Sequence, residues 1–184
     1  YVRAIRYASW RIGERGVIGF ITNAGYLDSN VMDGMRRCLT EEFTCIYIVH
    51  LRGRALGADK NEGGNVFNIK TPVAISILVK NPDIKERGQI YFYEIGDKLS
   101  KEEKLKRLRE WVSIDGIDDW QTIKTDQFGD WISLRDPHFD RYISLGNKRN
   151  KQLSTVFRSY SSGVKTNRDA WCYNASSAKL AANM

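Results

Sequence analysis

The sequence of 184 residues has few of the features that mark membrane, disulfide-bonded or metal-binding proteins. No apolar run approaches the roughly 18 residues that a membrane-spanning helix needs, so membrane insertion is not expected. The three cysteines form no C-x-x-C pair, and their odd number does not suit a disulfide framework, which predicts a cytoplasmic protein. The two histidines, His50 and His138, lack metal-ligand spacing, so no metal site is expected. The start at Tyr1 looks like a cut, without a signal peptide.

Motifs for cofactor binding and nucleophilic catalysis are also missing. A Rossmann-type cofactor site needs a glycine turn between a strand and a helix, and no G-x-G-x-x-G occurs. Neither the phosphate-binding G-x-x-x-x-G-K-[ST] nor the G-x-S-x-G nucleophile turn is present. General motifs therefore assign no catalytic residue to this chain.

Charge is the first positive indication of function. The 29 Lys and Arg outnumber the 22 Asp and Glu, which leaves a net charge of +7. This balance favours an anionic partner such as nucleic acid, and a solvated basic face is the alternative.

Helix and strand patterns alternate in the first 50 residues, which predicts an α/β fold. Apolar positions at helical spacing predict a helix over residues 1–14. The almost wholly apolar run Gly16–Thr22 predicts a strand buried on both faces, and Thr44–His50 predicts another strand.

A second helix is predicted between these two strands, beginning near Asp28 or Ser29. Arg36 and Arg37 are expected to point outward from it. Its apolar side chains recur every four residues, at Val31, Met35 and Leu39.

A long loop and two further strands follow. Residues 51–64 are polar, charged and rich in glycine, which is loop composition. Residues 72–80 and 89–95 read as strands. Because they are so close in sequence, we expect these two strands to run antiparallel.

The capping box Ser100–Glu103 predicts the start of a helix that reaches about Val112. Its basic residues, Lys104 among them, alternate with acidic ones, which predicts a solvated mixed face. The following residues 113–150 lack periodicity and read as an irregular connector, and a short helix is expected from Ser176. The tryptophans of this half are expected to pack in the core rather than stack on bases, namely Trp111, Trp120 and Trp131.

Five segments in this order and spacing resemble the modification part of a known enzyme family. The segments are N-A-G-Y-L-D-S-N (23–30), L-R-G-R (51–54), E-G-G-N-V-F (62–67), E-I-G-D-K-L-S-K-E-E-K-L (94–105) and S-S-G-V-K-T-N-R-D-A-W-C-Y-N (161–174). The chain resembles a gamma-type amino-methyltransferase, and more narrowly the Type ISP restriction-modification enzymes. These single-chain Type I enzymes join nuclease, helicase, adenine-N6 methyltransferase and target-recognition domains.

The resemblance implies an α/β fold that is the carboxyl-terminal half of a methyltransferase-type, Rossmann-like mixed sheet, followed by a helical and irregular connector. Residues 1–97 would form that half, residues 98–152 the connector, and residues 153–184 the start of the target-recognition domain. The last three strands of the family's sheet would be present, with the final one, Val73–Lys80, antiparallel.

The function implied is methyl transfer from S-adenosylmethionine to adenine N6 of duplex DNA. In the family, the cofactor turn and the N-P-P-Y segment precede the region matched here, so no catalytic or cofactor-binding residue is expected in this chain, nor cofactor binding by it alone. Its partners would be double-stranded DNA, the other half of the methyltransferase, and the helicase and nuclease domains. The alternative is a DNA-binding or assembly module without catalysis, from a truncated gene.

Two residues are predicted to approach the target adenine. In related methyltransferases an aromatic at the place of Phe67 stacks on the flipped base, because an extruded base needs a new π-face. The alternative is that Phe67 anchors the loop in the core. Asn23 follows a strand at the edge where open α/β sheets bind ligands, and it either contacts substrate or caps the turn.

The remaining predicted contacts are to DNA. Arg52 and Arg54 flank a glycine in the long loop and either grip phosphate or remain solvated. A polar and basic run after Ser162-Gly163 suits phosphate or base-edge contacts, and the alternative is a solvated loop in which Arg168 pairs with Asp169 or another neighbour. This run comprises Lys165, Thr166, Asn167 and Arg168.

Overall fold

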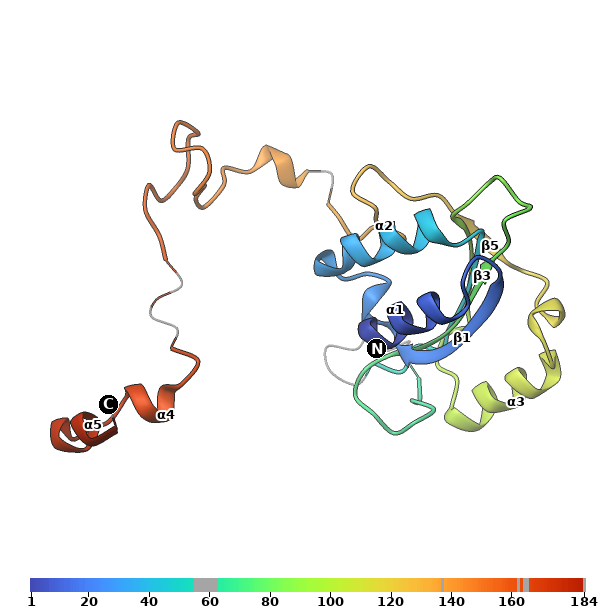
Figure 1. The fold of residues 1–184 in the computed structure, drawn as a ribbon, viewed down its shortest axis with the longest axis horizontal. Coiled ribbons are helices and arrows are strands. Elements are labelled where there is room, and N and C mark those ends of the chain that lie inside the picture. The colour runs from blue at the N-terminus through green and yellow to red at the C-terminus, as the bar shows by residue number, and fades with distance from the viewer. Residues whose placement is uncertain (55–62, 137, 162, 164–165, 184) are drawn as a thin grey trace. The chain divides into compact units, whose positions relative to one another are not determined.

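The chain divides into two units, Tyr1–Leu134 and Arg135–Met184 (Figure 1). The computed structural model describes residues 1–54, 63–136, 138–161, 163 and 166–183. The first unit is a mixed sheet with helices on both faces, which confirms the predicted α/β class. The division between the units falls inside the stretch predicted to be an irregular connector.

The sheet has five strands in the order β1-β3-β2-β4-β5. Strand β3 runs antiparallel to both β1 and β2, as predicted for the third strand. Strands β2 and β4 are parallel, and β5 pairs antiparallel with β4. The strand bounds are Gly16–Asn23, Cys45–His50, Val73–Lys80, Gln89–Glu94 and Gln121–Ile123 for β1 to β5.

Strands β3 and β4 do run in opposite directions, but β2 lies between them. The prediction that β1 is buried on both faces is wrong. Among the strands that the structure describes, β1 borders only β3, and its Val17 and Ile21 are 63% and 57% exposed. The helix on that face, Lys101–Trp111, belongs to a core cluster with residues of β2, β3 and β4 but none of β1.

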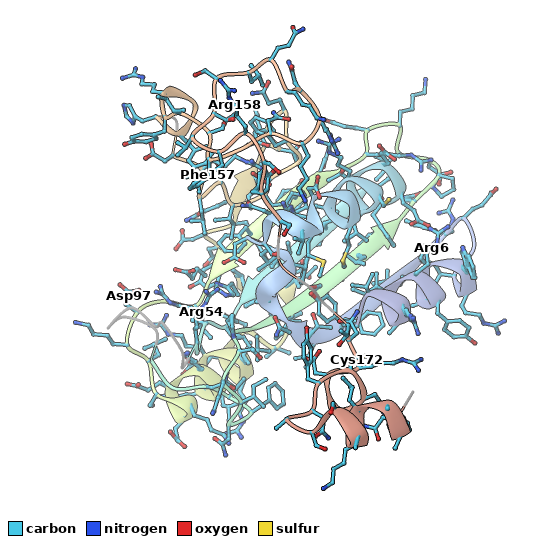
Figure 2. All side chains as sticks on the ribbon, turned by 90° about the vertical axis from the view of Figure 1, so that its left-hand side faces the viewer. Arg6, Arg54, Asp97, Phe157, Arg158 and Cys172 are labelled. Carbon is cyan, nitrogen blue, oxygen red and sulfur yellow. The ribbon has the colours of Figure 1, made fainter. Side chains whose placement is uncertain are left out.

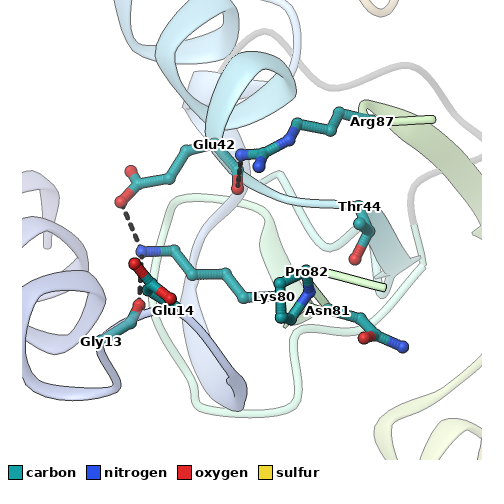
Figure 3. Close-up of a pocket in the computed structure, with 8 residues that line it drawn as sticks. All are labelled: Gly13, Glu14, Glu42, Thr44, Lys80, Asn81, Pro82 and Arg87. Atoms are coloured by element: carbon teal, nitrogen blue, oxygen red, sulfur yellow. Dashed lines mark hydrogen bonds and ion pairs between the residues drawn. The ribbon is translucent and has the colours of Figure 1, made fainter. Parts of the chain in front are cut away.

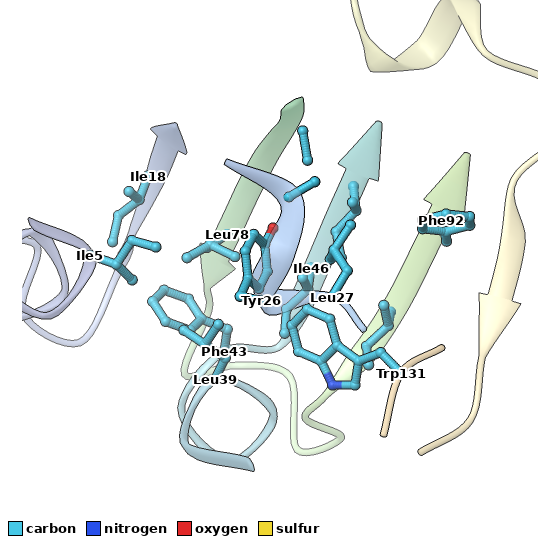
Figure 4. Packing of buried hydrophobic residues seen from close by; sticks show 14 residues of the cluster. Ile5, Ile18, Tyr26, Leu27, Leu39, Phe43, Ile46, Leu78, Phe92 and Trp131 are labelled. Carbon is cyan, nitrogen blue, oxygen red and sulfur yellow. The ribbon is translucent and has the colours of Figure 1, made fainter. Parts of the chain in front are cut away.

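Helices α1, Val2–Arg11, and α2, Asp33–Glu42, cover the other face. Their apolar residues meet those of β1, β2 and β3 in the larger core (Figure 4). Two short 3-10 helices, η1 (Ala24–Tyr26) and η2 (Asn30–Met32), connect β1 to α2, so α2 begins later than predicted. The buried side chains of this core include Ile5, Ile18, Tyr26, Leu39, Phe43, Ile46 and Leu78.

Arg36 does not point outward as predicted but is fully buried. Its Nη2 lies 2.5 Å from Asp130 Oδ1, and its Nε donates to the Gly129 carbonyl at 2.9 Å. Its Nη1 donates to the carbonyls of Tyr26 and Ser29 at 2.9 and 2.8 Å. The guanidinium is buried because one carboxylate neutralises it and three carbonyls satisfy its donors.

Helix α3, Lys101–Trp111, covers the face of the sheet opposite α1 and α2, and its predicted capping box is confirmed. Glu103 N donates to Ser100 Oγ at 3.2 Å, and Ser100 N donates to Glu103 Oε2 at 2.7 Å. The connector contains two elements that the sequence pattern missed, η3 (Ile114–Gly116) and β5. The packing role predicted for the tryptophans is confirmed, since Trp131 belongs to one core cluster and Trp111 and Trp120 pack against the other.

The second unit holds η4 (Phe139–Arg141), α4 (Asp169–Cys172) and α5 (Ser177–Asn183), the last of which confirms the predicted helix after Ser176. A loop between η4 and α4 is closed by two backbone hydrogen bonds, Val156 N to Ser144 O at 3.0 Å and Phe157 N to Leu145 O at 2.7 Å. This closed loop, residues 144–157, is called the basic loop below.

Candidate functional site

One edge of the sheet gathers the predicted site residues of the first unit. Because β3 is antiparallel, its amino end lies beside the carboxyl ends of β1 and β2. Backbone hydrogen bonds join these ends directly, from Ala24 N to Pro72 O at 2.9 Å and from Leu51 N to Val73 O at 2.8 Å. Asn23, Arg52, Arg54 and Phe67 belong to the segments that meet here.

Phe67 is presented at the surface by a braced turn. Its ring is 55% exposed, so the alternative that it anchors the loop in the core is wrong. The turn is held by Asn65, whose Oδ1 accepts from Phe67 N at 2.8 Å. The Nδ2 of Asn65 donates to the carbonyls of Gly53 and Thr71 at 2.9 and 2.8 Å. One side-chain amide therefore joins three segments around an exposed aromatic ring. Stacking of that ring on a base stays a prediction.

Lys104 joins the two ends of the long loop. Its amine donates to the carbonyls of Leu51 at 2.8 Å and Gly64 at 2.7 Å. The residue is fully buried, so the prediction that it belongs to a solvated face is wrong. The i+4 spacing from Ser100 turns it toward the loop, where backbone carbonyls replace water around the ammonium. Counting the charges along the sequence of α3 cannot distinguish Lys104 from its exposed neighbour Lys106.

Two glycines allow this loop to lie against the start of α3. Gly63 has φ +67°, and a Cβ there would collide with the carbonyl oxygen of Leu99. Gly64 N donates to that same oxygen at 2.9 Å. The close backbone contact and the left-handed conformation explain why the segment before Phe67 carries paired glycines.

Arg52 is held by carboxylates of the chain itself. Its Nη1 lies 2.6 Å from Glu94 Oε1 and 2.5 Å from Asp97 Oδ1, and only 13% of its side chain is exposed. His50 Nδ1 lies 3.0 Å from the second Glu94 oxygen. The hydrogen bond from His50, with the Arg52 charge and hydrogen bond, lowers the pKa of Glu94. Arg52 is therefore neither solvated nor a free cation, and a phosphate contact by it remains only a prediction.

Arg54 and Asn23 also have partners within the chain. Arg54 Nη2 lies 3.1 Å from Asp28 Oδ2, with 42% of the Arg54 side chain exposed. Asn23 caps the turn at the end of β1, since its Oδ1 accepts from Gly25 N at 2.6 Å. The turn-capping alternative for Asn23 is thus present in the structure, while its approach to substrate stays a prediction.

The predicted contacts of the second unit lie beside a short helix. Lys165 falls outside the described residues. The Thr166 hydroxyl donates to the Asp169 carboxylate and accepts from Arg168 N, the latter at 3.1 Å. Asp169 thus has Thr166 as a partner. Asn167 and Arg168 are exposed, and their DNA contacts are untested.

A cavity of about 310 Å³ lies between β3 and the ends of α1 and α2 (Figure 3). Lys80 at its wall has an ion pair with Glu42 at 2.6 Å and donates to the carbonyls of Ser9 and Gly13 at 3.2 and 3.3 Å. Its donors are therefore already engaged in joining α1, α2 and β3, which makes it a structural clamp.

No group of His, Cys, Asp and Glu suited to a metal occurs among the described residues. The described helices are all too short or too polar to cross a membrane.

Comparison with protein-family models and with curated proteins finds no match. Comparison with solved structures does find matches. The chain resembles segments of larger proteins whose structures were determined in complex with DNA, among them restriction-modification enzymes.

The structural relatives include the ATP-dependent Type ISP restriction-modification enzyme LlaBIII bound to DNA, with 43% identity and a TM-score of 0.82 over 99% of this chain. A nuclease-deletion mutant of the Type ISP enzyme LlaGI, in complex with a DNA substrate mimic, has 39% identity and a TM-score of 0.76 over 100% of the chain. The DrdV–DNA complex has 30% identity and a TM-score of 0.75 over 98%. The chain spans 12%, 17% and 18% of these proteins, respectively.

Proposed function

We propose that this chain is part of a Type ISP restriction-modification enzyme and forms the carboxyl-terminal half of its adenine-N6 methyltransferase domain. The observation that carries the proposal is the similarity to LlaBIII over 99% of the chain at 43% identity. Residues 98–152 would then connect this half to the start of the target-recognition domain at 153–184. Double-stranded DNA would be the substrate of the whole enzyme, and the enzyme would act in the cytoplasm.

The geometry of Phe67 supports a role at the target base. An adenine turned out of the duplex loses its stacking partners, and an exposed aromatic face replaces them. The ring of Phe67 is exposed, and the amide of Asn65 braces the turn that carries it. Asn23 lies at the same sheet edge and would approach the substrate from the end of β1.

The free edge of β1 supports the proposal that this sheet is incomplete. Within the described part of the chain, strand β1 has one neighbour, and its exposed Val17 and Ile21 form an apolar face beside an edge with no described partner. The other half of the methyltransferase would pair with that edge. S-adenosylmethionine, the methyl donor of the whole enzyme, would be bound by that other half.

A chimera tests the proposal. The matching segment of LlaBIII is replaced by this chain, and transfer of labelled methyl groups from S-adenosylmethionine to DNA is measured, with identification of N6-methyladenine in the digested product. ATP hydrolysis by the chimera reports that the rest of the enzyme has folded. A chimera that hydrolyses ATP and binds DNA without forming N6-methyladenine would contradict the proposal and favour the alternative of a non-catalytic DNA-binding module.

A further inference from the structure

The positive charge of the chain is concentrated in its second unit. Residues 135–184 contain nine Lys and Arg against three Asp, a net charge of +6. The first unit contains 20 basic and 19 acidic residues, a net charge of +1. Within the second unit, residues 141–168 contain seven basic residues and no acidic one. The charge of +7 is therefore a local property of the second unit.

The basic loop gives this charge a defined shape. Its neck is closed by the two backbone hydrogen bonds between residues 144–145 and 156–157. Its tip begins with a turn in which Asn147 Oδ1 accepts from the backbone N–H groups of Arg149 and Asn150, both at 2.9 Å. The turn continues where Gln152 N donates to Asn150 Oδ1 at 3.0 Å. These hydrogen bonds hold the backbone that carries Lys148, Arg149 and Lys151 in one folded turn.

The cations of this loop are not neutralised by the part of the chain that the structure describes. Lys148, Arg149 and Lys151 of the loop, and Arg158 directly after it, are all exposed, and no ion pair joins any of them to a described acidic residue. This contrasts with Arg52 of the first unit, which contacts two carboxylates. Unpaired cations on a closed loop attract a polyanion without first breaking an internal ion pair.

A hollow and exposed aromatic rings accompany the cations. A cavity of about 480 Å³ is lined by residues of the loop and by Arg158, with Lys151 among them. Phe157, at the end of the loop, and Tyr160 are 53% and 47% exposed, and Figure 2 shows Phe157 and Arg158 in this part of the chain. The amine of Lys148 lies 5.0 Å from the centre of the Tyr160 ring, which positions it by a cation–π contact.

We propose that the basic loop is a binding site for the phosphate backbone of double-stranded DNA, with Lys148, Arg149 and Lys151 as its main contacts. The identification of the polyanion as DNA rests on the proposed function, whereas the site itself rests on the charges and geometry above. Phosphate contacts orient a protein on DNA without reading sequence, so the site would hold the duplex whatever the recognition sequence is.

The test is a salt titration of DNA binding by the whole chain. A labelled duplex of about 25 base pairs is titrated with the chain and with the K148Q/R149Q/K151Q variant at several salt concentrations. Because each phosphate contact contributes about 0.9 to the slope of log K against log salt, the variant should lose about 2 to 3 from that slope. Its affinity at low salt should fall by at least about 10-fold. Two duplexes of unrelated sequence should give the same result, since no base is read.

A variant of equal charge in the first unit serves as the control. K85Q/K98Q/K124Q likewise removes three exposed positive charges, all from lysines, and it should retain the original slope and lose less than about 3-fold in affinity. Equal losses in the two variants would overturn the proposal, because binding would then follow net charge rather than the loop. An unchanged slope in the loop variant would overturn it as well.

The chimera described above separates this inference from the proposed function. If the chimera methylates adenine but the loop substitutions leave its salt dependence unchanged, the loop assignment is wrong and the proposed function stands. If the loop substitutions reduce the salt slope of a chimera that does not methylate, the loop assignment stands and the proposed function is wrong.

Discussion

Arg36 and Asp130 form a fully buried ion pair that joins residues 94 positions apart in the sequence. The Nη2 to Oδ1 distance is 2.5 Å, and neither side chain is more than 4% exposed. The pair attaches the segment that carries Trp131 to helix α2, so the last part of the first unit closes over the larger core.

Replacing Asp130 by alanine should reduce the free energy of unfolding by about 3 to 5 kcal/mol, because the Arg36 charge would remain buried without its partner. Urea unfolding followed by circular dichroism measures the change. The exposed pair Arg15–Asp83 provides the control, since both side chains are more than 60% exposed, and D83A should cost no more than about 1 kcal/mol. Similar losses in the two variants would show that burial does not set the strength of the Arg36 pair.

Replacing Lys104 by methionine should loosen the base of the long loop. The substitution keeps an unbranched apolar side chain, one atom shorter than that of lysine, but leaves the carbonyls of Leu51 and Gly64 without their donor, at a cost of about 1 to 3 kcal/mol for each unsatisfied buried group. Hydrogen exchange at the Gly64 amide should accelerate, because that amide donates to the Leu99 carbonyl and belongs to the residue whose own carbonyl Lys104 holds. The K106M variant of the exposed Lys106 should leave the exchange rate unchanged.

Replacing Phe67 by alanine in the chimera should reduce methylation by about 5- to 150-fold, since stacking on a flipped base is worth about 1 to 3 kcal/mol. Stability should change little because the ring is 55% exposed. A fluorescent adenine analogue at the target position should brighten in the variant. The control is I69A, which truncates a nearby side chain that is 44% exposed and should leave methylation and fluorescence as they were. Unchanged fluorescence in F67A would contradict the stacking role.

The pH dependence of stability should reveal the partners of Glu94. Its pKa is lowered in the folded chain by the hydrogen bond from His50 and by Arg52, so its stabilising contribution is complete above the ordinary value of 4.5 and is lost as the pH falls below it. The difference in unfolding free energy between the natural chain and E94Q should therefore shrink as the pH decreases from 5 to 3. A difference that grows over this range would reverse the assigned direction of the shift.

The chain alone should not bind S-adenosylmethionine measurably, because the glycine turn expected of such a cofactor site does not occur in its sequence. Isothermal titration calorimetry checks this expectation. A micromolar dissociation constant would mean that the cofactor site had been assigned to the wrong half of the domain.

The sequence by itself determined the local elements. The apolar runs specify strands, and Ser100 with Glu103 specifies the start of α3, because these patterns depend on neighbours within a few residues. It also determined that an aromatic follows paired glycines at Phe67. The absence of acidic residues between 141 and 168 was equally readable, but a net charge taken over the whole chain conceals it.

Only the tertiary structure decided which charged residues are buried. Arg36 and Lys104 occur in helices with the same local pattern as solvated residues, and their partners lie 94 and 53 positions away in sequence. It also decided that one face of β1 is exposed, because an apolar run has the same composition whether one face of the strand is covered or both. Local periodicity reports what a segment can form, whereas burial and ion pairing depend on which distant segments pack against it.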